Sequence, residues 1–256
     1  MSHTSTYYAG EYPDIWEEVF VNKKQRRKEK RKSSNHSLKI RSIIPRTPAQ
    51  DEAFEQYYNN QNLVLYGCAG TGKTFLSLYL ALSEILGSND DRKRNVTIFR
   101  SVVPTRDIGF LPGNEKEKSK AYEAPYHAIV NDLFGRGDAY EVLKGKKLVE
   151  FETTSFIRGM TFDDSIIIVD ECQNLTFHEL DSLITRVGVN TKIIFCGDYE
   201  QSDFAGKREE SGLREFMNIL DNMKDFYHVK FTQHDIVRSG LVKDYIIAKI
   251  RMSNNL

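Results

Sequence analysis

Short apolar runs, separated by glycine-rich or charged segments, recur along the chain from about residue 60 to residue 231. Six of these runs have the length and the β-branched or aromatic content of strands: residues 63–66, 95–100, 148–153, 166–169, 192–195 and 226–231. The run Ile166-Ile167-Ile168-Val169 is apolar at every position, which is typical of a strand buried on both faces of its sheet.

Segments with helical patterning lie between the predicted strands. They cover residues 48–58, 75–87, 119–134, 176–187, 209–222 and 241–252. Strands that alternate with helices indicate a parallel sheet covered by helices on both faces. We therefore predict an α/β fold with a mostly parallel sheet, and we expect ligands at the carboxyl ends of the strands.

The chain of 256 residues has room for one large α/β domain and a short appendage. We predict a single domain over residues 41–256 and a flexible basic arm over residues 1–40. Residues 23–32 carry eight basic side chains and one acidic side chain, although the whole chain has no net charge. Such a block is typical of a solvated, disordered arm, and it can also contact nucleic-acid phosphates or an acidic face of another subunit.

No apolar run approaches the 18 residues of a membrane span, and the first 20 residues lack the apolar core of a signal peptide. The three cysteines, Cys68, Cys172 and Cys196, show neither a disulfide framework nor the spacing of metal ligands. We expect a cytoplasmic protein without a membrane partner, with cysteines that serve as small apolar fillers near the sheet.

Residues 67–74 read G-x-x-x-x-G-K-T and lie between a predicted strand and a predicted helix, which is the context of a phosphate-binding loop. Backbone N–H groups and the helix N-terminus bind phosphate oxygens in such a loop. Lys73 is expected to reach the β- and γ-phosphates, and the Thr74 hydroxyl is expected to help hold Mg²⁺. The other predicted nucleotide contacts are Gly67, Cys68, Ala69, Gly70, Thr71 and Gly72.

Two acids, Asp170 and Glu171, follow the strand at 166–169. In a chain with a phosphate loop, Asp170 is expected to orient the Mg²⁺ shell, and Glu171 to position or deprotonate an attacking water. An exposed turn is the alternative for this pair. After the next strand, the predicted sensors of the γ-phosphate are Asp198 and Gln201, although Gly-Asp is also common in turns.

Three further polar residues have two interpretations each. Gln50 either completes a capping box with Thr47 at the start of the helix at 48–58, or hydrogen-bonds the edge of an adenine base. Arg238 either neutralises charge on a transferring phosphoryl group, in its own subunit or a neighbouring one, or lies unpaired on the surface. Arg158 is a weaker candidate for a contact with nucleic acid or phosphate.

Together these residues resemble the PhoH family over about residues 45–252. The resemblance rests on the loop 67–74, Arg158-Gly159-x-Thr161, Asp170-Glu171-Cys172-Gln173-Asn174-x-Thr176, Gly197-Asp198-x-x-Gln201-x-Asp203, Asp235-Ile236-Val237-Arg238 and Gly109-Phe110-Leu111-Pro112-Gly113. Cys172 stands where the family usually has alanine, a small change that should leave the metal chemistry intact.

The resemblance implies a RecA-like P-loop ATPase that uses ATP and Mg²⁺ and is related to superfamily 1 helicases. It further implies action on RNA or single-stranded DNA, and a homo-oligomer with a hexameric ring as one arrangement. The small size and the divergent arm resemble phage members of the family, for which the location would be the host cytoplasm.

Superfamily 1 helicases bind ATP between two RecA-like domains, and this chain has room for one. We therefore expect a neighbouring subunit to complete the site. Two other functions stay open. One is an ATP-controlled assembly switch that binds a protein partner, and the other is a small-molecule kinase. Glu171 and the lack of an arginine-rich lid disfavour the kinase.

Overall fold

The computed structural model describes residues 38–87, 94–101, 115–154, 157, 159–198 and 207–254. The chain divides into two compact units, Met1–Lys39 and Ile40–Leu256, and all the described helices and strands lie in the second. Because the predicted basic arm falls almost wholly outside the described residues, its conformation and its role stay predictions.

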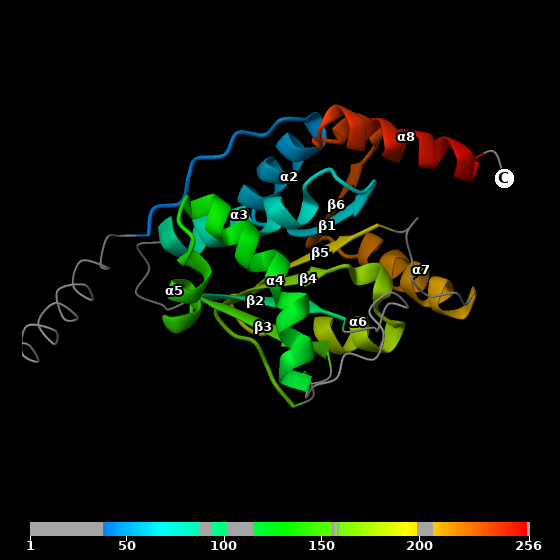
Figure 1. Cartoon of the computed structure of the whole chain (residues 1–256). Helices are drawn as coiled ribbons and strands as arrows, with labels where there is room; N and C mark the ends of the chain where they lie inside the picture. Colours follow the sequence, from blue (N-terminus) through cyan, green and yellow to red (C-terminus); the bar gives the residue numbers. More distant parts are fainter. Residues whose placement is uncertain are drawn as a thin grey trace, which may run out of the picture. The chain divides into compact units, whose positions relative to one another are not determined.

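The described part of the chain forms a six-stranded sheet in which every neighbouring pair is parallel (Figure 1). The strand order is β3-β2-β4-β5-β1-β6, which places β4, β5 and β1 side by side at the centre. The strands are β1 (Asn62–Gly67), β2 (Asn95–Arg100), β3 (Val149–Thr153), β4 (Ser165–Asp170), β5 (Lys192–Gly197) and β6 (Phe226–Phe231). The loops after β1, β4 and β5 therefore meet at one edge of the sheet.

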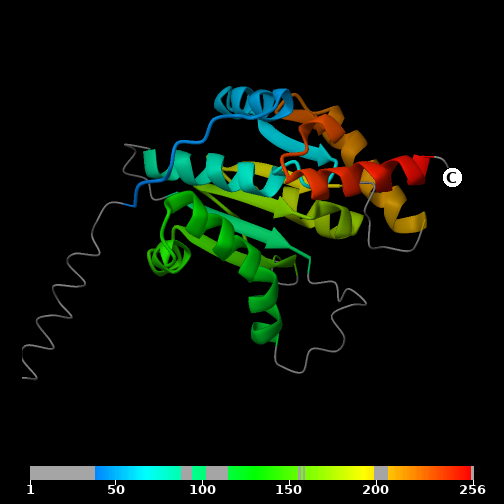
Figure 2. The same ribbon diagram turned by 45° about the horizontal axis from the view of Figure 1, so that its top comes forward.

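One face of the sheet is covered by helices that contact each other as well as the strands (Figure 2). They are α2 (Pro48–Tyr58), α3 (Lys73–Gly87), α4 (Glu115–Phe134) and the short α5 (Ala139–Gly145). The opposite face is covered by α6 (Phe177–Ile184) and α7 (Lys207–Asp221). Two 3-10 turns, η2 (Cys172–Asn174) and η4 (Gln233–Asp235), follow β4 and β6, and α8 (Gly240–Asn254) ends the described chain.

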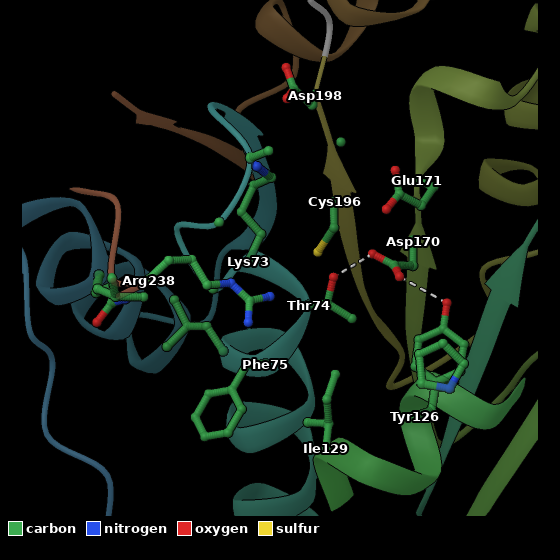
Figure 3. Close-up of a pocket in the computed structure, with 18 of the residues that line it drawn as sticks. Lys73, Thr74, Phe75, Tyr126, Ile129, Asp170, Glu171, Cys196, Asp198 and Arg238 are labelled. Atoms are coloured by element: carbon green, nitrogen blue, oxygen red, sulfur yellow. Dashed lines mark hydrogen bonds between the residues drawn. The ribbon is translucent and has the colours of Figure 1, made fainter. Parts of the chain in front are cut away.

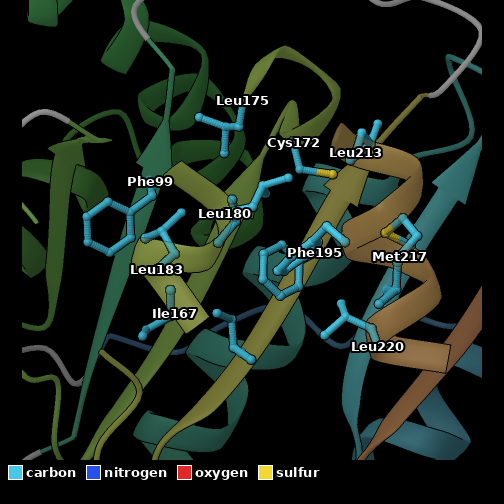
Figure 4. Packing of buried hydrophobic residues seen from close by; sticks show 14 of the residues in the cluster. Phe99, Ile167, Cys172, Leu175, Leu180, Leu183, Phe195, Leu213, Met217 and Leu220 are labelled. Atoms are coloured by element: carbon cyan, nitrogen blue, oxygen red, sulfur yellow. The ribbon is translucent and has the colours of Figure 1, made fainter. Parts of the chain in front are cut away.

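A continuous apolar core fills the space between the sheet and the pair α6 and α7 (Figure 4). Its strand residues include Ile167 and Val169 of β4 and Phe195 of β5, and its helix residues include Leu180 and Leu220. All four apolar residues of β4 are fully buried, as the unbroken apolar run predicts. A shift of β4 would disturb the helices packed on both faces of the sheet. The carboxylates at the end of β4 are therefore held in fixed positions.

The predicted fold class is confirmed, and the chain has the α/β sheet of a RecA-like P-loop fold. All six strands lie where the apolar runs place them, within one or two residues. The helix predicted over 176–187 ends earlier, at Ile184, because Val187 leaves it to form a parallel bridge with Phe162. None of the described helices is long and apolar enough to cross a membrane.

Candidate nucleotide-binding site

The loop after β1 has the backbone that its glycines predict. Gly67, Gly70 and Gly72 have φ angles of 113°, 76° and 89°, which side chains disfavour. A Cβ atom at Gly67 would lie 2.0 Å from the carbonyl oxygen of Phe231, and that oxygen accepts a hydrogen bond of 3.0 Å from the Cys68 N–H. The end of β6 therefore holds the first turn of the loop in place.

Lys73 extends across this loop. Its Nζ donates hydrogen bonds of 2.6 Å and 2.8 Å to the carbonyl oxygens of Gly67 and Cys68. The Thr71 hydroxyl donates to the same Cys68 oxygen over 3.0 Å. The ammonium group is thus held at the loop, where an anionic phosphate would meet it as a point charge.

The sheet brings the end of β4 to the first turn of α3. The Thr74 hydroxyl donates a hydrogen bond of 2.8 Å to Oδ1 of Asp170 (Figure 3). Asp170 is only 4% exposed. Burial, together with the neighbouring charge of Glu171, raises the pKa of Asp170, although hydrogen bonds from Thr74 and Tyr126 and the charge of Arg100 oppose the rise.

The chemistry of Thr74 and Asp170 fits Mg²⁺. Mg²⁺ takes oxygen ligands and is usually held by one or two carboxylates, substrate phosphates and water rather than by an all-protein cage. No group of three possible His, Cys, Asp or Glu ligands occurs among the described residues. A cation beside Asp170 would also offset the cost of burying its negative charge.

Glu171 adopts an unusual backbone conformation. Its φ and ψ angles of 51° and 43° lie in the left-handed region, which a residue other than glycine adopts at a cost. Its carboxylate accepts a hydrogen bond from the side-chain amide of Gln173. Both residues line the pocket, so the strained turn directs the second acid of the pair into the site.

The turn after β4 packs closely on the end of β5. A Cβ atom at Gly197 would lie 2.5 Å from the Cys172 sulfur, so a larger residue would force the buried thiol to move. Cys172 and Cys196 are both buried, and burial raises the pKa of each thiol. They are the small fillers near the sheet that the sequence predicts, whereas Cys68 is partly exposed.

The capping box predicted for Gln50 forms only in part. Thr47 caps α2 as predicted, by accepting from the Gln50 N–H over 3.4 Å. The Gln50 side chain, however, accepts from the Arg46 N–H over 2.9 Å and donates to the Thr71 carbonyl oxygen over 3.0 Å. The predicted return bond to Thr47 is therefore replaced, and the buried amide ties the start of α2 to the phosphate loop.

Arg238 lines the same pocket as Lys73 and Thr74 (Figure 3). The segment that carries it is fixed to the phosphate loop by a hydrogen bond of 3.1 Å from the Val237 N–H to the Gly70 oxygen. A Cβ atom at Gly70 would lie 3.0 Å from Cγ of Arg238, which shows how closely the side chain crosses the loop. Arg238 itself is exposed, so its guanidinium can reach a bound anion or a neighbouring molecule.

The pocket has a volume of about 720 Å³ and includes residues that sequence patterns did not single out. Arg100 ends β2 directly opposite Asp170 in the sheet register, and Tyr126 of α4 donates a hydrogen bond to Asp170. The rule that ligands gather at carboxyl ends of strands points to Arg100. No local signal points to Tyr126, because its partner is 44 residues away.

The pocket is also lined by apolar residues, among them Ile43, Phe75 and Ile129. Of the predicted sensors, Asp198 is described and is buried at the end of β5. Gln201 and Arg158 lie outside the described residues, so their predicted roles stay predictions.

Comparisons with known proteins identify the family of this chain. Residues 42–249 match the family described as "PhoH-like protein". The chain is 32% identical to the PhoH-like protein of Bacillus subtilis, over 83% of this chain and 65% of the relative, and 30% identical to the protein PhoH of Escherichia coli, over 78% and 56%. The chain thus spans a little over half to about two thirds of the length of these curated relatives.

Solved structures with similar folds are more distant. The large terminase of a thermophilic bacteriophage, in complex with ADP, is 14% identical with a TM-score of 0.48, over 78% of this chain and 48% of that one. The UvsW helicase of bacteriophage T4 is also 14% identical, with a TM-score of 0.43, over 80% and 67%. On the family match, this chain belongs to the PhoH-like protein family.

Proposed function

We propose that this protein hydrolyses ATP with the help of Mg²⁺. The observation that carries the proposal is the hydrogen bond of 2.8 Å between Thr74 and Asp170, which joins the phosphate loop to the acid pair. A hydroxyl at the start of the loop helix and an acid at the end of a neighbouring strand form the metal-holding pair of P-loop enzymes. Thr74 and Asp170 would hold the metal, and the metal would neutralise charge that develops on the phosphates.

The side chains around Thr74 and Asp170 have the other proposed roles in phosphate binding and hydrolysis. Lys73 contacts the β- and γ-phosphates from inside the loop, and the loop N–H groups bind the same oxygens. Glu171, held by Gln173, accepts the proton of the attacking water or orients that water. Arg238 offers a positive charge across the loop, where it stabilises the transferring phosphoryl group. Gln201 is the proposed sensor of hydrolysis.

The apolar residues that line the pocket are suited to the base of the nucleotide. Ile43, Phe75 and Ile129 present hydrocarbon and aromatic surface beside the phosphate loop. The Gln50 amide has one N–H bonded to Thr71, which leaves its second N–H for an adenine nitrogen. Adenine recognition by Gln50 therefore remains part of the proposal.

Coupling to RNA or single-stranded DNA is the second part of the proposal. The family resemblance and the basic block at residues 23–32 support it, because such a block binds phosphates without reading sequence. A homo-oligomer is the third part. The exposed position of Arg238 supports a site that a neighbouring subunit completes.

The test is steady-state ATP hydrolysis with Mg²⁺ at low salt, in the presence and absence of single-stranded RNA and single-stranded DNA. We expect hydrolysis that requires Mg²⁺ and rises strongly with one of the two polymers. A hydrolysis rate that neither polymer changes would contradict coupling to nucleic acid, but it would still support the ATPase proposal. A monodisperse monomer that keeps full ATPase activity through a dilution series would contradict the proposed homo-oligomer.

An ATP-controlled assembly switch is a second candidate, because an exposed apolar surface lies on the helix beside the phosphate loop. In α8, Leu241 is 83% exposed and Tyr245 is 70% exposed, although Ile246 of the same helix lies beside Gly70. A nucleotide that shifts the loop could change how this helix is presented to a protein partner. Slow ATP turnover at a rate that nucleic acid does not change would favour this candidate.

A further inference from the structure

The two carboxylate oxygens of Asp170 are held by two different elements. Thr74 of α3 donates to Oδ1 over 2.8 Å, and the Tyr126 hydroxyl of α4 donates to Oδ2, also over 2.8 Å (Figure 3). The first bond belongs to the phosphate loop. The second comes from the opposite side of the carboxylate and has no part in the proposed function so far.

The Tyr126 hydroxyl is in an environment that makes its bond strong and directional. Tyr126 is fully buried and Asp170 is 4% exposed, so water does not compete for either group. A hydrogen bond to an ionised acceptor in such surroundings is stronger than one between neutral groups. The tyrosine ring packs on Phe151 of β3, with 5.5 Å between ring centroids, which fixes where the hydroxyl points.

The backbone around Tyr126 adds to this constraint. Pro125 lies inside α4, where it removes one helical hydrogen bond and favours a bend. The helix bends along its length in both views of the molecule (Figures 1 and 2). Tyr126 follows the proline directly, so the bend and the ring packing together set the distance from its hydroxyl to Asp170.

We propose that Tyr126 is a positioning residue for the metal site, which keeps Oδ2 of Asp170 occupied and turns Oδ1 toward Thr74 and the bound cation. The proposal rests on the proposed function of Asp170 as a metal-holding residue. The hydrogen bond from Tyr126 uses one lone pair of Oδ2, which disfavours binding of the cation by both oxygens of Asp170. Octahedral Mg²⁺ suits that arrangement better than a larger cation, which often takes both oxygens of a carboxylate.

The chain contains a matched control for removal of this hydroxyl. Tyr140 of α5 is also fully buried, and its hydroxyl also donates over 2.8 Å to a buried carboxylate, that of Glu123. Neither Tyr140 nor Glu123 lines the pocket. Tyr126→Phe and Tyr140→Phe therefore remove the same kind of bond, and only the first removes it at Asp170.

The experiment measures Mn²⁺ binding by electron paramagnetic resonance, in the presence of saturating ADP, for the full-length wild type and both variants. Mn²⁺ reports on the site without any requirement for turnover. Removal of a residue that orients a metal ligand typically weakens metal affinity by about 10-fold or more. We expect that increase in the dissociation constant for Tyr126→Phe, and a change within about twofold for Tyr140→Phe. ADP binding without metal should match wild type in both.

A second variant, Phe151→Leu, keeps the tyrosine hydroxyl but loosens the packing that aims it. It should weaken Mn²⁺ binding in the same direction and by a smaller factor, and it tests the proposal if Tyr126→Phe does not fold. Equal Mn²⁺ affinities in Tyr126→Phe and Tyr140→Phe would overturn the positioning role while leaving the metal site intact. If wild type with ADP bound no Mn²⁺, the proposed function itself would fail.

Discussion

The side-chain oxygen of Gln173 accepts a hydrogen bond of 3.0 Å from the backbone N–H of Asp198. The amide nitrogen of the same side chain donates to the carboxylate of Glu171. One residue of the turn after β4 therefore connects the proposed base to the chain that leaves β5. A movement of the turn after β4 or of the chain after β5 would therefore displace the other through the Gln173 side chain.

Two substitutions at Gln173 separate its structural and functional contributions. Gln173→Ala removes both bonds, including the one to the backbone N–H of buried Asp198, at a cost of about 1–3 kcal/mol in the free energy of unfolding. Gln173→Glu can still accept from Asp198 but places a second negative charge at Glu171. We expect both variants to lose about 10-fold or more in kcat for ATP hydrolysis, and Gln173→Glu to stay closer to wild type in stability. Wild-type kcat in both variants would contradict the link.

Glu171→Gln should separate ATP binding from ATP hydrolysis. The amide keeps the size of the side chain but cannot accept a proton, and loss of a general base typically costs about 10²–10⁴-fold in rate. We expect ATP affinity near that of wild type and trapped, unhydrolysed ATP in a single-turnover experiment. Retained binding with normal turnover would show that Glu171 is not the base.

An ion cluster at the other end of α3 predicts how stability depends on pH. The Glu84 carboxylate forms a 2.9 Å ion pair with Lys192 and a second ion pair with Arg94. Burial raises the pKa of Glu84, but hydrogen bonds from Tyr57 and Lys192 and the two positive charges outweigh burial and hold the pKa below its usual range. The stability gained from this group is therefore present above about pH 4.5 and is lost as the pH falls through the lowered pKa.

Glu84→Gln tests this assignment. Because the charges of Lys192 and Arg94 lose a mostly buried partner, we expect the free energy of unfolding to fall by about 3 kcal/mol at pH 7. The variant should also lose less stability than wild type when the pH is lowered from 5 to 3. Urea denaturation across that range measures both effects, and parallel pH profiles for the two proteins would show that Glu84 is not responsible.

Much of the fold could be predicted because its strands are encoded locally. The run from Ile166 to Val169 is apolar at every position, which favours the centre of a sheet, where it is fully buried. The glycines of the phosphate loop adopt positive φ angles, which other residues disfavour. The seven-residue α5 was not predicted, because three buried positions (Ala139, Tyr140 and Leu143) are too few to show a helical period.

The candidate site was predictable only where its residues belong to local motifs. Lys73, Thr74, Asp170 and Glu171 line one pocket as their spacing suggests. Contacts between distant segments were not predictable. The Gln50 side chain bonds to Thr71, 21 residues away, although its local pattern indicates a capping box. Which long-range partner a polar side chain takes depends on packing that sequence periodicity does not specify.

Deletion of residues 1–40 tests the proposed role of the basic arm. If residues 23–32 contact phosphates, the deletion should weaken binding to single-stranded nucleic acid and flatten its dependence on salt, because fewer counterions are released. Fluorescence anisotropy over a series of salt concentrations measures the slope for both proteins. An unchanged slope would assign the arm a different role, such as a contact with another subunit.

The rate of phosphate release from ATP by wild type and by Lys73→Ala, with Mg²⁺ and with a chelator, tests whether the phosphate loop supports Mg²⁺-dependent ATP hydrolysis. Lys73 lies over the loop carbonyls and not in the core, so the variant should keep the far-ultraviolet circular dichroism of wild type. We predict release by wild type only with Mg²⁺, and a rate reduced by about 100-fold or more in Lys73→Ala. Equal rates in the two proteins, or phosphate release at the same rate with and without Mg²⁺, would show that this site does not hydrolyse ATP as proposed.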